Sequence, residues 1–253
     1  MLLLALAHFA LADDGDSIVG EITYEGGNSA TAANYVRGKP VTITHASGNL
    51  TVRCMDTDKL SARLQYTVFG SSEGPMQTMG NGIGLAVWGD STSGGAKTRI
   101  PSKPSGVRQA DVTLTVNVPK GASAVTVSET GPGWVQVTDC DGIVKITAGA
   151  GGAYASGHFT AATVTATGGD VKVVQLDDAV FKSTTTVSAP GGNATVEFAP
   201  AQGGKLTVKG AEVAVNQTIM GTNTDTLIQG DLGVAGPAIT VSAKGKAEVK
   251  QNR

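Results

Sequence analysis

Alternating apolar and hydroxyl-bearing residues recur along the chain in short runs that are separated by glycine turns. In VTITHASGNLTV, residues 41–52, Val41 and Ile43 alternate with threonines ahead of the turn at Gly48. Strict alternation is typical of a strand with one buried face, and glycine can adopt the positive φ that a tight turn requires. Each unit is therefore predicted to be two strands joined by a turn. The same form returns in VTVSETGPGWVQV (125–137), VTATGGDVKV (164–173), TTVSAPGGNATV (185–196) and ITVSAKGKAEV (239–249).

The spacing of the units indicates a repeat architecture. Gly169 and Gly192 are 23 residues apart, which is close to one coil of a β-solenoid, and the 85 residues from Gly48 to Gly133 are close to four coils. Small β-branched residues can stack as ladders inside such a narrow coil. We therefore predict an all-β, single-stranded β-solenoid. Two tandem β-sandwiches are the alternative, because strand spacing alone permits them.

Helical patterns are nearly absent. Apolar residues at i, i+3 and i+4 never persist for ten residues, and glycine interrupts almost every window. Two stretches rich in Gly, Ser and Pro, residues 69–84 and 89–106, are predicted to be loops that leave the scaffold. The expected domain plan is a signal peptide at 1–12, an N-terminal strand or cap segment at 13–40, and a β-solenoid at 41–253 that carries these two loop insertions.

The first residues have the form of a secretory signal peptide. MLLLALAHFALADDGDS combines a short apolar stretch with a small-x-small triplet at 10–12 and then an acidic switch, although no basic residue precedes the apolar stretch. A buried N-terminal strand is the alternative. No later run reaches the roughly 18 apolar residues needed to span a bilayer. We expect export to the periplasm, the cell surface or the medium, without a transmembrane segment.

Composition narrows the range of partners. The formal net charge is −2 and the pI is about 5.9, so no basic field attracts nucleic-acid phosphates. Charged residues make up 16% of the chain, aromatic residues 4%, and 35 residues are glycine, which disfavours both a disordered chain and a helical bundle. Nucleic acid is therefore not an expected partner.

Two cysteines, Cys54 and Cys140, each follow the second strand of a unit, in LTVRCMD and VQVTDCDG. In an oxidising compartment such a pair is a candidate disulfide, provided that the two Cα atoms come close enough. Two small buried side chains are the other interpretation. A metal site is disfavoured, because neither cysteine belongs to a CxxC pair and neither His45 nor His158 has ligand spacing with them.

Candidate catalytic groups are few. Three acidic pairs also follow second strands, so stacking could gather them on one edge, yet Asp at such a position more often caps its own turn. These pairs are Asp56 and Asp58, Asp139 and Asp141, and Asp177 and Asp178. No other unit has a histidine at the position that matches His45, so His45 is interpreted as an incidental residue without a specific role. We expect no catalytic residue, no cofactor and no metal.

Outward-facing residues provide the remaining candidate chemistry. Trp88, Trp134 and Tyr154 are candidate platforms for sugars, or else they plug the core. Thr and Ser occupy the same two outward positions in five units, so stacked units would present rows of hydroxyl groups, or ranks. Such rows resemble those of ice-binding solenoids, although the high strand propensity of Thr explains them more simply. The pairs assigned to these ranks are Thr42/Thr44, Thr126/Ser128, Thr165/Thr167, Thr186/Ser188 and Thr240/Ser242.

The run ADVTLTVNVPKGASAVTVSETGPGWVQVTDCDGIVKITAGAG, residues 110–151, followed by TVTATGGDVKV, resembles the bacterial "putative adhesin" families of unknown function. The shared features are a strand ending in VPKGA and serial units of the form x-V-x-V-x-x-x-G-D-V-x-V. The resemblance implies an exported, right-handed β-helix across about 41–253, and it implies no catalytic residue. Trp134 and Ala194 depart from the family pattern.

Two functions are consistent with these features. The first is a non-catalytic adhesin or structural scaffold of the cell envelope or surface, whose partners would be a surface glycan or an envelope protein. A variant of it is self-association through the solenoid ends, because an uncapped coil exposes strand edges that can pair. The second is a glycan-binding or polysaccharide-processing β-helix, which the acidic pairs would serve.

Overall fold

The computed structural model describes residues 22–217 and 219–251. The predicted signal peptide at 1–12 and the first part of the 13–40 segment lie outside these residues. The described chain is all-β apart from one short helix and contains nineteen strands. No helix in this part of the chain is both long and apolar enough to cross a membrane.

The strands are the units that the alternating pattern predicts, together with longer strands near the start of the chain. In the first half they are β1 (Ile22–Ala32), β2 (Val41–His45), β3 (Asn49–Met55), β4 (Leu60–Gly70), β5 (Gly84–Gly89), β6 (Gly94–Arg99), β7 (Val107–Pro119), β8 (Ala124–Glu129) and β9 (Val135–Ala148). In the second half they are β10 (Ala153–Ala166), β11 (Val171–Gln175), β12 (Thr185–Ala189), β13 (Ala194–Phe198), β14 (Lys205–Lys209), β15 (Glu212–Val215), β16 (Met220–Asn223), β17 (Leu227–Asp231), β18 (Ala238–Ala243) and β19 (Lys246–Gln251).

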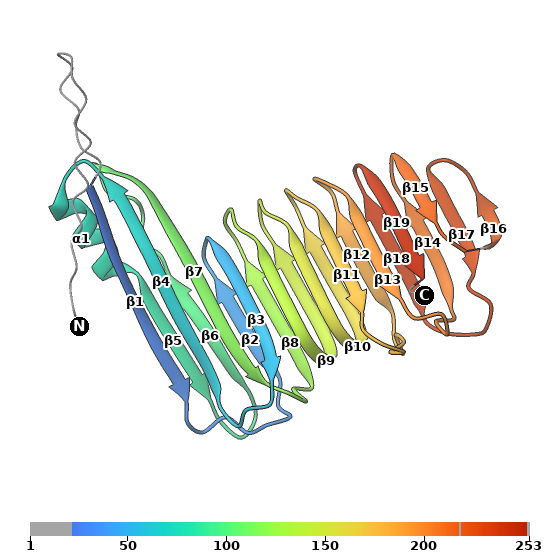
Figure 1. The fold of residues 1–253 in the computed structure, drawn as a ribbon, viewed down its shortest axis with the longest axis horizontal. Helices are drawn as coiled ribbons and strands as arrows, with labels where there is room; N and C mark the ends of the chain where they lie inside the picture. The colour runs from blue at the N-terminus through green and yellow to red at the C-terminus, as the bar shows by residue number, and fades with distance from the viewer. Residues whose placement is uncertain (1–21, 218, 252–253) are drawn as a thin grey trace, which may run out of the picture.

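Parallel pairing joins most strands into two long series. Ladder 1 runs in the order β6, β2, β8, β9, β10, β12, β18 and β14. Ladder 2 runs in the order β7, β3, β9, β10, β11, β13, β19 and β15. The long strands β9 and β10 belong to both. Figure 1 shows the strands side by side along the longest axis, and this connected sheet is too large for a simple sandwich.

The strand pairs do not follow one another in chain order. The pair β2 and β3 lies between β6/β7 and β8/β9, and the pair β18 and β19 lies between β12/β13 and β14/β15. As a result Gly48 N–H donates to Pro132 O at 3.0 Å, and Gly245 N–H donates to Gly192 O at 3.0 Å. The 85 residues from Gly48 to Gly133 were predicted to span about four coils. That interpretation is wrong, because the two turns are direct neighbours.

Antiparallel strands flank the ladders at both ends. At one end β4 pairs with β7 and β1 pairs with β4, while β5 pairs with β6. At the other end β17 pairs with β14 and with β16. The segment 69–84, predicted to be a loop, contains helix α1 (Glu73–Gly82), and the segment 89–106 contains β6. The helix escapes the periodicity test because Met76 and Met79 supply its buried contacts amid three glycines.

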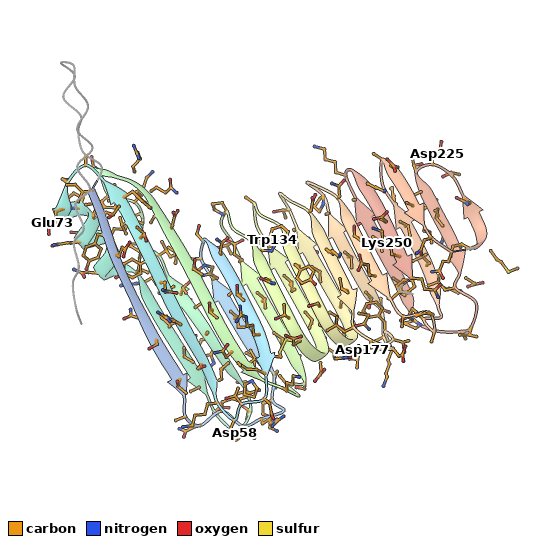
Figure 2. All side chains as sticks on the ribbon, viewed as in Figure 1. Asp58, Glu73, Trp134, Asp177, Asp225 and Lys250 are labelled. Carbon is orange, nitrogen blue, oxygen red and sulfur yellow. A yellow bond between two sulfur atoms is a disulfide. The ribbon has the colours of Figure 1, made fainter. Side chains whose placement is uncertain are left out.

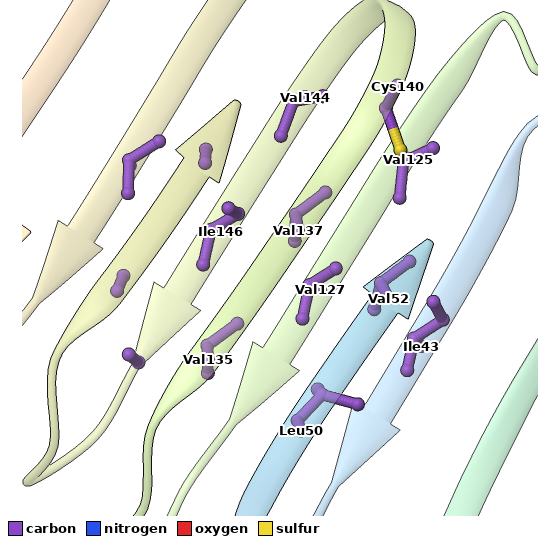
Figure 3. Packing of buried hydrophobic residues seen from close by; sticks show 14 of the residues in the cluster. Ile43, Leu50, Val52, Val125, Val127, Val135, Val137, Cys140, Val144 and Ile146 are labelled. Carbon is purple, nitrogen blue, oxygen red and sulfur yellow. The ribbon is translucent and has the colours of Figure 1, made fainter. Parts of the chain in front are cut away.

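The core lies between the two ladders and consists of small inward side chains. Inward residues at one register position form rows, and Figure 3 shows several of them pointing into the same space. One row contains Ile43, Val127, Ile146, Val164, Val187 and Val241, each at most 1% exposed. Burial of each such side chain stabilises the fold by about 1.5–3 kcal/mol. This explains why a chain with so few aromatic residues can form a continuous core.

Two buried glutamines bind main-chain groups at the corners, where the chain passes from one ladder to the other. The Gln175 amide accepts from Phe159 N–H at 2.8 Å and donates to Phe159 O at 2.8 Å. Gln202 accepts from Phe181 N–H at 2.6 Å and donates to Gly203 O at 2.6 Å. Buried polar groups of the corner backbone therefore keep hydrogen-bond partners where the ladder pairing stops.

Candidate functional site

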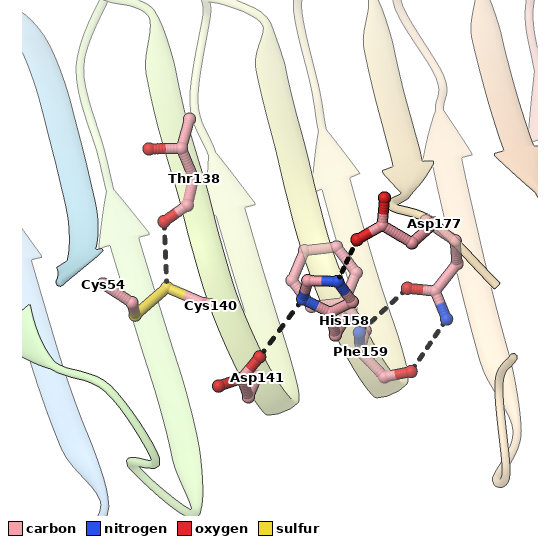
Figure 4. A network of polar contacts seen from close by, with 8 residues as sticks. Cys54, Thr138, Cys140, Asp141, His158, Phe159 and Asp177 are labelled. Carbon is pink, nitrogen blue, oxygen red and sulfur yellow. Dashed lines mark hydrogen bonds and ion pairs between the residues drawn. A yellow bond between two sulfur atoms is a disulfide. The ribbon is translucent and has the colours of Figure 1, made fainter. Parts of the chain in front are cut away.

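An imidazole lies between two carboxylates at one corner of the stack (Figure 4). His158 in β10 is aligned with Asp141 in β9, and Asp177 follows β11. His158 Nδ1 lies 3.4 Å from Asp141 Oδ1, and Nε2 lies 2.9 Å from Asp177 Oδ2. Stacking thus brings together members of two of the three acidic pairs, with the ring between them.

This corner has the character of a surface ion pair. The side chain of His158 is 45% exposed and that of Asp177 is 83% exposed, so solvent screens the interaction. Asp139 and Asp177 have φ values of 60° and 50°, which agrees with the turn-forming role of Asp. Among the described residues no group of three or more His, Cys, Asp or Glu side chains could hold a metal ion. In the third acidic pair, Asp56 instead forms an ion pair with Arg37 at 3.2 Å.

Cys54 and Cys140 form a disulfide with a Cα–Cα distance of 4.8 Å. The bond joins β3 to β9, which are neighbours in ladder 2 because the pair β2 and β3 is inserted beside β8 and β9. Both cysteines are buried. The disulfide therefore fixes the position of the inserted N-terminal strands.

His45 is fully buried, so its interpretation as an incidental residue without a specific role is wrong. Its Nδ1 lies 2.9 Å from Thr98 Oγ1, and its Nε2 has no hydrogen-bond partner among the described residues. Burial lowers the pKa of His45 to about 4, so the ring is neutral at neutral pH. The signal was present in the sequence, because His45 continues the inward alternation of Val41 and Ile43.

A buried carboxylate neighbours this histidine. Glu129 is aligned with His45 in ladder 1 and is 1% exposed. Burial raises the pKa of its carboxyl group, while hydrogen bonds from Gly131 N–H at 2.7 Å and Gly149 N–H at 3.2 Å oppose that shift. His45 and Glu129 are thus internal polar residues near one turn, with no opening to solvent that would make them a binding site.

The outer face of ladder 1 carries two rows of hydroxyls. Their register differs from the predicted one at β10, where Thr163 and Thr165 are aligned with Thr186 and Ser188. The predicted assignment of Thr165 and Thr167 to these rows is therefore wrong by two residues, and the aligned pair is Thr163 and Thr165. The rows are Thr42, Thr126, Lys145, Thr163, Thr186, Thr240 and Thr207, and Thr44, Ser128, Thr147, Thr165, Ser188, Ser242 and Lys209. Lys145 interrupts the first row, so the hydroxyl lattice is not continuous.

The outer face of ladder 2 is chemically different and carries an exposed aromatic ring. Trp134 is 44% exposed and directly precedes β9. Its ring lies over Gly152, since a Cβ atom at Gly152 would contact Trp134 Cζ3. Tyr154 lies half-buried on the neighbouring strand β10, aligned with Gln136 of β9. Figure 2 places Trp134 near the middle of the long axis, at the edge of the stack opposite Asp177.

The other tryptophan also lies outside the core. Trp88 is 41% exposed and is aligned with Gly95, over which its ring lies. Neither tryptophan plugs the interior, and the two belong to different parts of the surface, at ladder 1 and ladder 2. Trp88 and Trp134 are the chain's two tryptophans, so they can be distinguished spectroscopically.

Comparisons with known proteins give distant structural likenesses. A putative cell adhesion protein from Clostridium sporogenes is 13% identical with a TM-score of 0.46, covering 91% of this chain and 100% of its own. A putative adhesin from Bacteroides fragilis is 9% identical with a TM-score of 0.35, covering 88% and 97%. A putative lipid binding protein from Parabacteroides distasonis is 10% identical with a TM-score of 0.31, with the same coverage.

No family model and no curated protein matches the chain. The serial Gly-Asp-Val units that carried the resemblance to adhesin families are not present as a repeat. Gly-Asp-Val occurs at 169–171, and the equivalent positions on other strands carry Asn49, Trp134, Gly152, Asn193 and Lys246 in place of Asp170. The chain is therefore described by its own geometry, without a family assignment.

Proposed function

We propose that this chain is an exported, non-catalytic protein of the cell envelope or cell surface that acts as an adhesin or structural scaffold. The observation that carries the proposal is the strand stack itself, which presents two long outer faces of different chemistry. Such faces suit contact with an extended partner better than enclosure of a small substrate. The Asp141–His158–Asp177 corner is exposed and has the character of a surface ion pair, which is compatible with a non-catalytic role.

The fold that we propose for this function is a right-handed β-solenoid. Two series of parallel ladders that share β9 and β10 support it, because a coil returns to the same ladder once per turn. Residues 1–12 are proposed as the signal peptide that delivers the chain across the membrane. A disulfide between Cys54 and Cys140 is consistent with an oxidising compartment.

Cell fractionation tests the proposal. The full chain with a C-terminal epitope tag is produced in a bacterial host, beside a variant that lacks residues 1–12. We expect the full chain in the envelope or surface fraction, accessible to antibody on intact cells or after removal of the outer layer, and the truncated chain in the cytoplasm. Recovery of the full chain in the cytoplasm with its cysteines reduced would overturn the proposed export.

A further inference from the structure

A row of outward-facing residues crosses five neighbouring strands on the ladder 2 side of the molecule, and all of them except the glycine of β1 carry a side chain. Register places Gly27 of β1 opposite Gln65 of β4, Gln65 opposite Thr113 of β7, and Thr113 opposite Asn49 of β3. Asn49 Oδ1 then accepts a hydrogen bond from Trp134 N–H at 3.2 Å. Five strands at the usual spacing extend over about 19 Å, which is the length of several linked sugar residues.

The end of this row opposite Trp134 is hollowed. A depression of about 570 Å³ lies along β1 and β4 and is lined by residues 25–29 and 63–65. Gln65 and Arg63 line it, and both side chains are exposed. Glu25 and Arg63 carry opposite charges within the same depression, so it has no excess of either sign. The depression offers planar donors and acceptors to an uncharged ligand.

Trp134 is held as a rigid platform at the other end. Its carbonyl accepts from Leu50 N–H at 2.9 Å, and the next residue, Val135, donates to Gly152 O at 3.0 Å. The backbone is thus fixed to both neighbouring strands, and Gly152 leaves room for the ring. A flat ring held with its free face toward solvent is suited to stack against the apolar face of a pyranose.

Trp134 also replaces a residue type that has a structural role elsewhere in its row. Asn49, Asp170 and Asn193 occupy the same register position, and their side-chain oxygens accept from the N–H of the next strand. The distances are 3.2, 2.7 and 2.8 Å. An indole cannot accept such a bond. A position where the local rule is broken without a structural gain is a candidate for function.

From these observations we propose that the row from the hollow at β1 and β4 to Trp134 binds an extended chain of neutral sugars. The inference rests on the proposed function, because it names the ligand class of the surface protein. A protein partner is disfavoured, because the core of a protein interface is enriched in apolar and aromatic residues, whereas the neighbours Asn49 and Gly152 add no apolar side chain beside Trp134. Balanced charges in the hollow disfavour an acidic polysaccharide.

Tryptophan fluorescence tests the inference directly. In the Trp88→Phe variant Trp134 is the remaining tryptophan, and in the Trp134→Phe variant Trp88 remains. Each is titrated with gluco-, xylo-, manno- and chito-oligosaccharides and with the corresponding soluble polysaccharides. We expect a saturable emission change in Trp88→Phe with at least one sugar series, tighter for longer chains, and none in Trp134→Phe. Silence of Trp134 toward the whole panel would overturn the inference.

Substitutions then distinguish binding from folding. Trp134→Asn restores the acceptor that Asn49 and Asn193 provide, so it is expected to leave thermal stability at or above that of the wild type while weakening affinity at least tenfold. Gln65→Ala is expected to weaken affinity for long chains more than for short ones. Trp88→Ala, on the other face, is the matched control and should bind like the wild type. Equal affinity of Trp134→Asn and the wild type would contradict the assignment.

Adhesion to cells separates this inference from the proposed function. The purified protein is added to intact cells before and after periodate oxidation of their surface sugars. Loss of binding after periodate supports the glycan, whereas unchanged binding would replace the glycan by a protein partner and leave the adhesin proposal standing. Failure of fractionation to find the protein in the envelope would overturn the proposed function even if Trp134 binds sugars in solution.

Discussion

Acid should destabilise this protein through one buried histidine. The folded-state pKa of His45 is about 4, below its usual value of 6.5, because burial disfavours the imidazolium. The neutral form is therefore favoured in the folded state, and stability is fully present above pH 6.5. As the pH falls through 6.5, the unfolded chain takes up a proton that the folded chain refuses, so the free energy of unfolding decreases until about pH 4.

The magnitude follows from the size of the shift. The difference between 6.5 and about 4, at about 1.4 kcal/mol for each pKa unit, sets a ceiling of about 3.5 kcal/mol on the loss of stability, of which about 2 kcal/mol is already lost at pH 5. Loss of this size is a large fraction of the stability of an ordinary domain. Nδ1 of His45 contacts Thr98, while Nε2 has no hydrogen-bond partner among the described residues, so no hydrogen bond at Nε2 offsets the cost of burying the charged form.

The assay compares the wild type with His45→Asn, which keeps a donor and acceptor near Thr98 but does not titrate. Urea unfolding is measured at pH 7.5 and pH 5, with the disulfide intact in both proteins. We expect the wild type to lose about 2 kcal/mol more than the variant between these pH values. The raised pKa of Glu129 acts in the opposite direction, but it is common to both proteins and cancels in the difference. Equal pH dependence in the two proteins would refute the reasoning.

Three further changes test other parts of the structure. Replacing Cys54 and Cys140 by alanine opens a loop of 86 residues and should lower the free energy of unfolding by about 4 to 5 kcal/mol, which is measured as a lower urea midpoint. A decrease below about 1 kcal/mol would contradict this expectation. Gln175→Leu removes the acceptor of Phe159 N–H and the donor to Phe159 O, so it should lower the free energy of unfolding by about 2–4 kcal/mol in the same urea measurement. The exposed substitution Gln229→Leu is the control. His158→Ala should change stability by no more than about 0.5 kcal/mol, because the ion pairs are exposed, and a larger loss would show that the corner is structurally essential.

The sequence was informative about which side of a strand each residue occupies. The alternation in VTIT placed Val41 and Ile43 inside, and the structure buries both. The same alternation, continued by one step, would have placed His45 inside. Residue type alone argues against burial at this position, but a histidine can be buried when it stays neutral.

Register and strand order were harder to infer, and the reason is physical. A shift of two residues preserves every inward and outward assignment, so nothing in VTATGG distinguishes Thr163/Thr165 from Thr165/Thr167 as the hydroxyl pair. The order of strand pairs is equally hidden, because each unit presents the same small side chains and the same turn to any neighbour. The placement of β2/β3 and of β18/β19 between other strand pairs depends on long-range contacts, which no local sequence pattern encodes. The short helix cannot be distinguished from a loop by its sequence, because its glycines are typical of loops.

The same degeneracy explains where specificity must lie. If every unit fulfils the structural pattern, positions that obey the pattern carry no information about a ligand, and only departures from it do. Trp134 is such a departure, because Asn49, Asp170 and Asn193 use the equivalent position to hold the next strand. Its outward position was readable from the sequence, one residue before inward Val135. What the sequence lacked was the alignment of β1, β4, β7 and β3, which extends that single ring into a row that crosses the sheet.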